Sequence, residues 1–215
     1  MTSPSALEVL YEDNHIIVVN KPAGLLTQPS GTDQPSLEAL VKAWIKEKYQ
    51  KPGNVFLEAV HRLDKAVSGV VLFAKTSKAL SRLNASMRSK ETKKIYLAHV
   101  EGALSKSEGV LENYLIHDEY HATVVDANTK DAKLARLHYR VIGRDKDLSL
   151  VEIVLETGRY HQIRAQFAAL GCPIVGDVKY GSKTPWKKEA IALHHQSLQI
   201  PHPITHALMT FEVRK

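Results

Sequence analysis

Hydrophobic and polar residues alternate along most of the second half of the chain, and this pattern restricts the fold more than any other feature. Leu148 and Leu150, followed by Ile153 and Leu155, give the clearest example. Successive side chains of a β-strand point to opposite faces of a sheet, so a period of two predicts strands. Strands are expected at residues 94–100, 121–126, 134–142, 148–155, 193–200 and 207–213.

The first half of the chain mixes strands with helices. Short strands are expected at residues 7–12 and 15–19, and a buried strand at 69–74. Ser36 and Ser77 are suitable N-caps for two helices. A third helix is expected at about residues 160–170, ending at Gly171 before Pro173.

Strands and helices that do not alternate regularly argue against a doubly wound nucleotide-binding fold. The pattern instead indicates an α+β protein with a mixed, mostly antiparallel sheet flanked by helices. No internal repeat or linker is visible, so a single domain over residues 1–215 is expected.

Composition narrows the class of protein. The 215 residues include 29 Lys and Arg against 23 Asp and Glu, a formal charge of +6 that favours polyanionic partners. Cys172 is the sole cysteine, which excludes an internal disulfide and fits a reducing compartment. The longest apolar runs are far shorter than the roughly twenty residues of a membrane span. A cytoplasmic protein with no membrane association is therefore expected.

Asp64 ends a His-Arg-Leu-Asp run at residues 61–64, in an irregular stretch that leads into the apolar strand at 69–74. Loops held by a rigid scaffold often carry catalytic groups. Two alternatives stay open on the residues alone: Asp64 caps a turn, or it pairs with Arg62 at the surface.

Arg164 lies in the helix expected at 160–170. At 100° per residue, Ile163, Phe167 and Leu170 share one side of this helix, whereas Arg164 lies on the opposite side. One face should therefore anchor the helix and the other should present the arginine. An ordinary solvated arginine is the alternative.

The chain resembles the RluA-type RNA pseudouridine synthase family. The catalytic segment of that family matches residues 61–65 with Ser68-Gly69 and the strand after it, and a later segment matches 157–164 and 171–181. Weaker matches are residues 20–25, the strand at 94–98 and the last two strands. The resemblance implies a single catalytic domain with a central cleft between helix-flanked sheet elements. Some members of the family carry a small RNA-binding module before this domain, and no such N-terminal appendage is expected here.

The resemblance also implies an isomerase that converts uridine within RNA to pseudouridine. Asp64 would be the essential carboxylate, and Arg164 would pair with it and keep it ionised. Tyr96 would stack on the base, although on the residues alone a core or interface tyrosine is the commoner case in a strand. Arg62 would fill the space left by the flipped nucleotide. Whether Asp64 attacks the sugar or removes a C2′ proton stays open. The reaction needs no cofactor and no metal.

Basic residues gather between Lys75 and Lys94 and between Lys179 and Lys188, the latter around Tyr180 and Trp186. Basic and aromatic residues together suit an RNA backbone with exposed bases, although each lysine alone is as easily a solvated one. The candidate phosphate contacts are Lys93, Lys94, Lys187 and Lys188. The expected partner is tRNA or rRNA, bound by a monomer.

Two other functions are compatible with parts of this pattern. A non-catalytic RNA-binding or RNA-remodelling protein on the same scaffold would not need the combination of Asp64, Tyr96 and Arg164. A glycosidic-bond hydrolase usually needs two opposed carboxylates, and Glu156 is the nearest candidate for the second. A zinc site among His194, His195, His202 and His206 is disfavoured, because prolines at 201 and 203 exclude a helix there.

Overall fold

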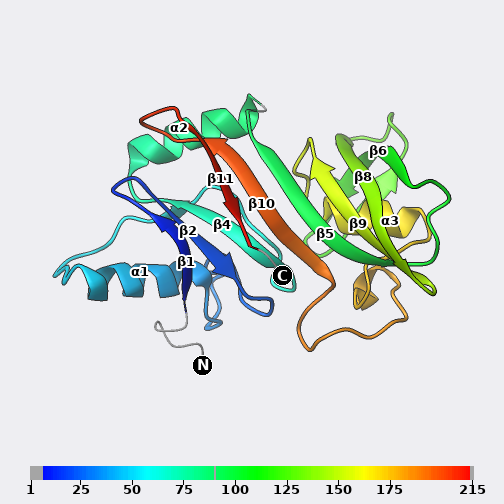
Figure 1. Ribbon diagram of the computed structural model, residues 1–215, viewed down its shortest axis with the longest axis horizontal. Helices are drawn as coiled ribbons and strands as arrows, with labels where there is room; N and C mark the ends of the chain where they lie inside the picture. Colours follow the sequence, from blue (N-terminus) through cyan, green and yellow to red (C-terminus); the bar gives the residue numbers. More distant parts are fainter. Residues whose placement is uncertain (1–6, 90, 214–215) are drawn as a thin grey trace. The chain divides into compact units, whose positions relative to one another are not determined.

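The computed structural model describes residues 7–89 and 91–213, and they form two compact units (Figure 1). The first unit comprises Met1–Thr92 together with Gln196–Lys215, and the second comprises Lys93–His195. The expectation of one catalytic domain over residues 1–215 stays a prediction, because compact packing within each unit does not say whether either works alone.

The first unit is built on a sheet in the order β1-β2-β4-β10. A short strand, β3, pairs with β4, and β11 pairs with β10. The pairings β1–β2, β2–β4, β3–β4 and β10–β11 are antiparallel. The strands are β1 (Glu8–Glu12), β2 (Ile16–Lys21), β3 (Glu58–Ala59), β4 (Ser68–Ala74), β10 (Leu193–Pro201) and β11 (Leu208–Glu212). Of β10, the part from Gln196 onward belongs to this unit.

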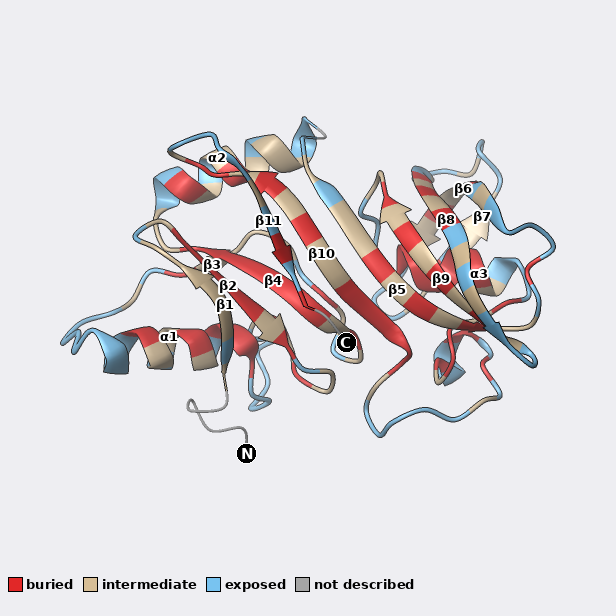
Figure 2. Cartoon of the chain, viewed as in Figure 1, coloured by how far each residue is buried: buried red, intermediate tan, exposed pale blue. Residues whose placement is uncertain are grey.

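Two helices belong to this unit. Helix α1 (Leu37–Lys48) is capped by Ser36, as predicted, and Ser36 Oγ accepts the N–H of Ala39 at 3.3 Å. Helix α2 (Ser77–Arg88) packs Ala79 and Leu83 into a core with β2, β4, β10 and β11. Its N-cap is Thr76, so the prediction of Ser77 as the cap was wrong by one residue. Figure 2 shows β4 buried along almost its whole length.

The second unit contains an antiparallel sheet in the order β5-β9-β8-β6-β7. The strand predicted at 148–155 matches β9 at both ends. Strand β6 was not expected, because Gly109, Glu112 and Asn113 interrupt its apolar residues with types that are rare in strands. The strands are β5 (Lys93–Glu101), β6 (Glu108–His117), β7 (Ala122–Val125), β8 (Lys133–Asp145) and β9 (Leu148–Leu155).

Helix α3 (Gln162–Ala169) is buried on all sides along most of its length. Every residue from Gln162 to Phe167 is buried, whereas Leu170, expected on the anchored face, is 48% exposed. The predicted amphipathic helix was therefore wrong. Polar side chains enter this core because they are bonded there: the Gln166 amide donates to the carbonyl oxygens of Leu111 and Ala135.

The α+β class with a mostly antiparallel sheet is confirmed. Within the two described stretches, no helix has both the length and the apolar character needed to cross a membrane.

Candidate active site

Asp64 lies in the loop between β3 and β4, and the neighbouring backbone is held firmly. The Thr27 hydroxyl donates to the carbonyl oxygen of Leu63 at 2.8 Å and accepts the N–H of Leu63 at 3.1 Å. After Asp64 the chain turns, with the N–H of Val67 bonded to the carbonyl oxygen of Asp64 at 3.0 Å. The half-buried aspartate is thus carried by a loop fixed on both sides.

Lys21, at the end of β2, ties a second segment to this loop. Its side chain is fully buried, and Nζ donates to the carbonyl oxygens of Leu25 at 2.6 Å, Pro22 at 3.0 Å and Lys65 at 3.2 Å. Burial lowers the pKa of Lys21 to about 8, and the negative charge of Asp64 acts in the opposite direction. A buried cation therefore lies in the electrostatic range of Asp64.

Tyr96 lies on β5 in the second unit and is 7% exposed. Its ring stacks on the imidazole of His195, with centroids 4.4 Å apart and planes inclined by 21°. The strand places Tyr96 opposite Ile153 of β9. Stacking on a base stays a prediction, and the ring is already packed against one aromatic neighbour.

Arg164, on α3, is held by several residues of the second unit. Its Nε and Nη2 donate to the two carboxylate oxygens of Asp177 at 2.6 and 2.9 Å. Its Nη1 lies 2.7 Å from Nε2 of His161, and the guanidinium lies over the ring of Tyr180 at 4.9 Å. The alternative of an ordinary solvated arginine is therefore wrong, since Arg164 is only 7% exposed.

The predicted pairing of Arg164 with Asp64 joins residues of different units and stays a prediction. The chemistry of the guanidinium is compatible with it. An arginine carries five N–H donors and can therefore bond more than one acceptor.

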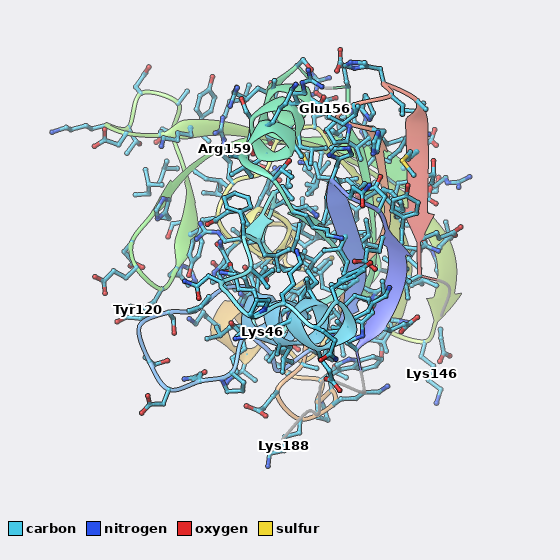
Figure 3. All side chains as sticks on the ribbon, turned by 90° about the vertical axis from the view of Figure 1, so that its left-hand side faces the viewer. Lys46, Tyr120, Lys146, Glu156, Arg159 and Lys188 are labelled. Atoms are coloured by element: carbon cyan, nitrogen blue, oxygen red, sulfur yellow. The ribbon has the colours of Figure 1, made fainter. Side chains whose placement is uncertain are left out.

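The predicted RNA contacts differ in their surroundings. Arg62, Lys93, Lys187 and Lys188 are exposed, and Figure 3 shows the side chain of Lys188 extending outward. Lys94 is partly buried, and burial lowers its pKa.

Other members of the first basic cluster have structural contacts. Lys75 forms a salt bridge with Glu12 at 2.7 Å, and Arg82 donates to the carbonyl oxygen of Pro203 at 2.8 Å. The cluster is therefore less uniform than its sequence indicated. Lys90, another member, lies outside the described residues.

Sequence reasoning assigned no role to Lys21, Thr27 or Asp177. Lys21 and Asp177 belong to motif segments that were recognised, at residues 20–25 and 171–181. Charged residues are usually exposed, so the local sequence pattern did not predict that the side chains of Lys21 and Asp177 would be buried.

Comparison with known proteins gives one consistent result. A family model described as RNA pseudouridylate synthase matches residues 15–169. The dual-specificity RNA pseudouridine synthase RluA of Yersinia pestis is 38% identical over 197 residues, covering 91% of this chain and 92% of that protein. RNA pseudouridine synthase YhcT of Bacillus subtilis is 37% identical over 209 residues, covering 96% of this chain and 68% of that protein.

Solved structures show the same fold. Human RNA Pseudouridylate Synthase Domain Containing 4 matches with a TM-score of 0.82 at 21% identity, covering 98% of this chain and 90% of that chain. Human RNA Pseudouridylate Synthase Domain Containing 1 matches with a TM-score of 0.79, covering 100% of this chain and 86% of that chain. The sequence matches and the shared fold together show that this chain belongs to the RNA pseudouridylate synthase family.

Proposed function

We propose that this protein isomerises specific uridines in RNA to pseudouridine, with Asp64 as the essential carboxylate. The observation that carries the proposal is the 38% identity to a named RNA pseudouridine synthase over nine-tenths of both chains. The anchored loop around Asp64 supports it, because a catalytic group must be held in place.

The reaction rearranges bonds without adding or removing atoms. The bond from C1′ to N1 of uridine breaks, the uracil turns, and C5 bonds to C1′. The proton displaced from C5 is balanced by one gained at N1. We assign to Asp64 the step that makes C1′ reactive, either by attack on the sugar or by removal of a C2′ proton.

Three residues would assist Asp64. Arg164 would pair with it and favour its ionised form, Tyr96 would stack on the uracil, and Arg62 would occupy the space vacated by the flipped nucleotide. The exposure of Arg62 is compatible with that task. Because the matching family model spans residues of both units, we propose that residues 1–215 act as one catalytic domain.

The substrate would be tRNA, rRNA or both. The Yersinia pestis relative is named as dual-specific, and a relative from Nitrosomonas europaea, 34% identical, is named ribosomal large subunit pseudouridine synthase D. We expect a cytoplasmic monomer. Mapping pseudouridines in tRNA and rRNA from cells with and without the protein would identify the target.

The two rival functions have less support. A non-catalytic RNA-binding protein has no use for an arginine held in the interior by a buried carboxylate. A two-carboxylate hydrolase would need Glu156, and that carboxylate is bonded to His138 at 2.5 Å.

Asp64→Asn tests the proposal directly. The variant should fold and bind RNA, yet release no tritium from RNA labelled at C5 of uridine, because an amide cannot replace the reacting carboxylate. Glu47→Gln, the same chemical change on the exposed surface of α1, is the control and should leave turnover intact. Normal tritium release by Asp64→Asn would refute the assignment.

A further inference from the structure

We infer that Asp177 and His161 are positioning residues for Arg164, fixing the guanidinium in the orientation in which it serves the catalytic carboxylate. This inference rests on the role proposed above for Arg164. It adds two residues that the reaction would need although neither is assigned a contact with the substrate.

The contact with Asp177 sets the plane of the guanidinium. Two parallel N–H to oxygen bonds, at 2.6 and 2.9 Å, join Nε and Nη2 of Arg164 to the carboxylate of Asp177. A bidentate pair fixes direction as well as distance. The side chains of Arg164 and Asp177 are only 8% and 2% exposed, so water competes little for either partner. Buried ion pairs contribute little net stability, so geometric control is the better reason for this one.

The backbone that carries Asp177 is itself fixed. Its N–H donates to the carbonyl oxygen of Ile174 at 3.0 Å, and its own carbonyl oxygen accepts the N–H groups of Tyr180 and Ser182 at 2.9 and 3.1 Å. The carboxylate therefore starts from a rigid turn just before η2 (Val178–Tyr180). A rigid support is what a positioning contact requires.

His161 holds a third nitrogen of the same guanidinium. Arginine can only donate, so Nε2 of His161 must accept from Nη1 at 2.7 Å. The ring proton is then on Nδ1, which donates to the Tyr180 hydroxyl oxygen at 2.9 Å. That oxygen also accepts the N–H of Ala122 at 2.8 Å.

The backbone of His161 is in the left-handed region, with φ 49° and ψ 24°, a conformation that most residues adopt only when their surroundings require it. The ring of Tyr180 also lies beneath the guanidinium, 4.9 Å from it. Arg164 is thus held at one edge by a carboxylate, at one nitrogen by an imidazole and on one face by an aromatic ring. Each of these contacts limits the rotation of the guanidinium, so its orientation is set by three different groups of the second unit.

The test compares Asp177→Asn with Glu101→Gln. Asparagine keeps the size of the side chain but loses the charged, bidentate acceptor. Glu101 is the matched control: its carboxylate, in the same unit, accepts from Ser182 Oγ and from the backbone N–H groups of Lys183 and Thr184, and it has no role assigned in the reaction. Single-turnover rate and RNA Kd would be measured at a temperature where circular dichroism shows both variants fully folded.

Asp177→Asn should slow the single-turnover reaction by about 10- to 100-fold, the range that follows from displacing a reacting group by about 1 Å, with Kd for RNA essentially unchanged. Glu101→Gln should keep the wild-type rate. A rate for Asp177→Asn near wild type, or equal losses in both variants, would overturn the inference. If Asp177→Asn does not fold, the same rate and Kd measurements on His161→Asn test the inference. Asparagine tolerates the left-handed backbone at this position but lacks the imidazole acceptor.

Arg164→Lys separates this inference from the proposed function. An inactive Arg164→Lys beside a fully active Asp177→Asn would overturn only the positioning role. An active Arg164→Lys would overturn the role assigned to Arg164 itself, because one ammonium cannot reproduce the bidentate contact.

Discussion

Lys21 makes folding stability dependent on pH in a direction unusual for a lysine. In the folded protein its pKa is about 8, against an ordinary value of 10.5. The unfolded chain therefore binds more protons than the folded one between these values, and stability rises with pH across that window. The contribution of Lys21 to the free energy of unfolding is fully present above about pH 10.5 and is lost as the pH falls through about 8. The difference between the two pKa values corresponds to roughly 3 kcal/mol.

Lys21→Met should remove this dependence. Free energies of unfolding from urea titrations would be measured for wild type and variant at several values between pH 7.5 and 10.5. The stability of wild type relative to Lys21→Met should increase steadily with pH, because taking the difference cancels other groups that titrate there. Lys46→Met, a change at an exposed lysine on α1, should give a flat difference. A flat difference for Lys21→Met would show that its amine is not desolvated in solution.

The sequence identified candidate site residues but not the contacts that their side chains make. Asp64 and Arg164 were recognised from their runs and from the family resemblance. Asp177 and Lys21 were in view as motif members, yet their contacts depend on turns that bring separate segments together. Periodicity placed Arg164 on an open face, whereas burial of a charged group requires a partner, and the partner is not in the helix.

The loop between β3 and β4 depends on one hydroxyl from outside it. Thr27 Oγ1 bonds both the N–H and the carbonyl oxygen of Leu63, and both residues are buried. Thr27→Val keeps the shape but leaves these two backbone groups without that partner, at an expected cost of about 1–3 kcal/mol. Urea denaturation should show this loss, and tritium release should fall because Asp64 is the next residue along the chain.

Thr27→Ser provides the matched control for that change. Serine retains the hydroxyl and loses only a methyl group, so most of the stability and activity should return. If valine and serine destabilised the protein equally, the methyl packing of Thr27 would matter rather than its hydrogen bonds.

Among the elements, strands that alternate cleanly were predicted well and those that depend on tertiary contacts were not. Strand β9 alternates along its whole length and was placed at both ends. Strand β6 carries glycine and polar residues and is ordered through its pairing with β7 and β8. Helix α3 was located within two residues of its start, but its burial on all sides follows from packing that periodicity does not report.

For the whole molecule, charge sets the expected response to salt. If Lys93, Lys187 and Lys188 contact RNA phosphates, binding releases counterions and affinity falls steeply as salt rises. Replacing all three by glutamine should weaken binding to many RNAs alike and reduce the slope of log affinity against log salt by about 2, at roughly 0.7 to 0.9 per phosphate contact. Lys94 is left in place because its partial burial would confuse binding with folding.

A second triple variant, at Lys46, Lys130 and Lys146, separates local contact from general attraction. These lysines are also exposed, and either variant lowers the formal charge from +6 to +3. If RNA responded only to net charge, both variants would flatten the slope equally. The predicted result is a flattened slope only for the first, measured by fluorescence anisotropy from about 50 to 200 mM salt. Phosphate contacts hold RNA without performing chemistry, so single-turnover rates at saturating RNA should stay near wild type in both variants. If the first variant left the salt slope unchanged, Lys93, Lys187 and Lys188 would be solvated surface residues that do not contact the RNA.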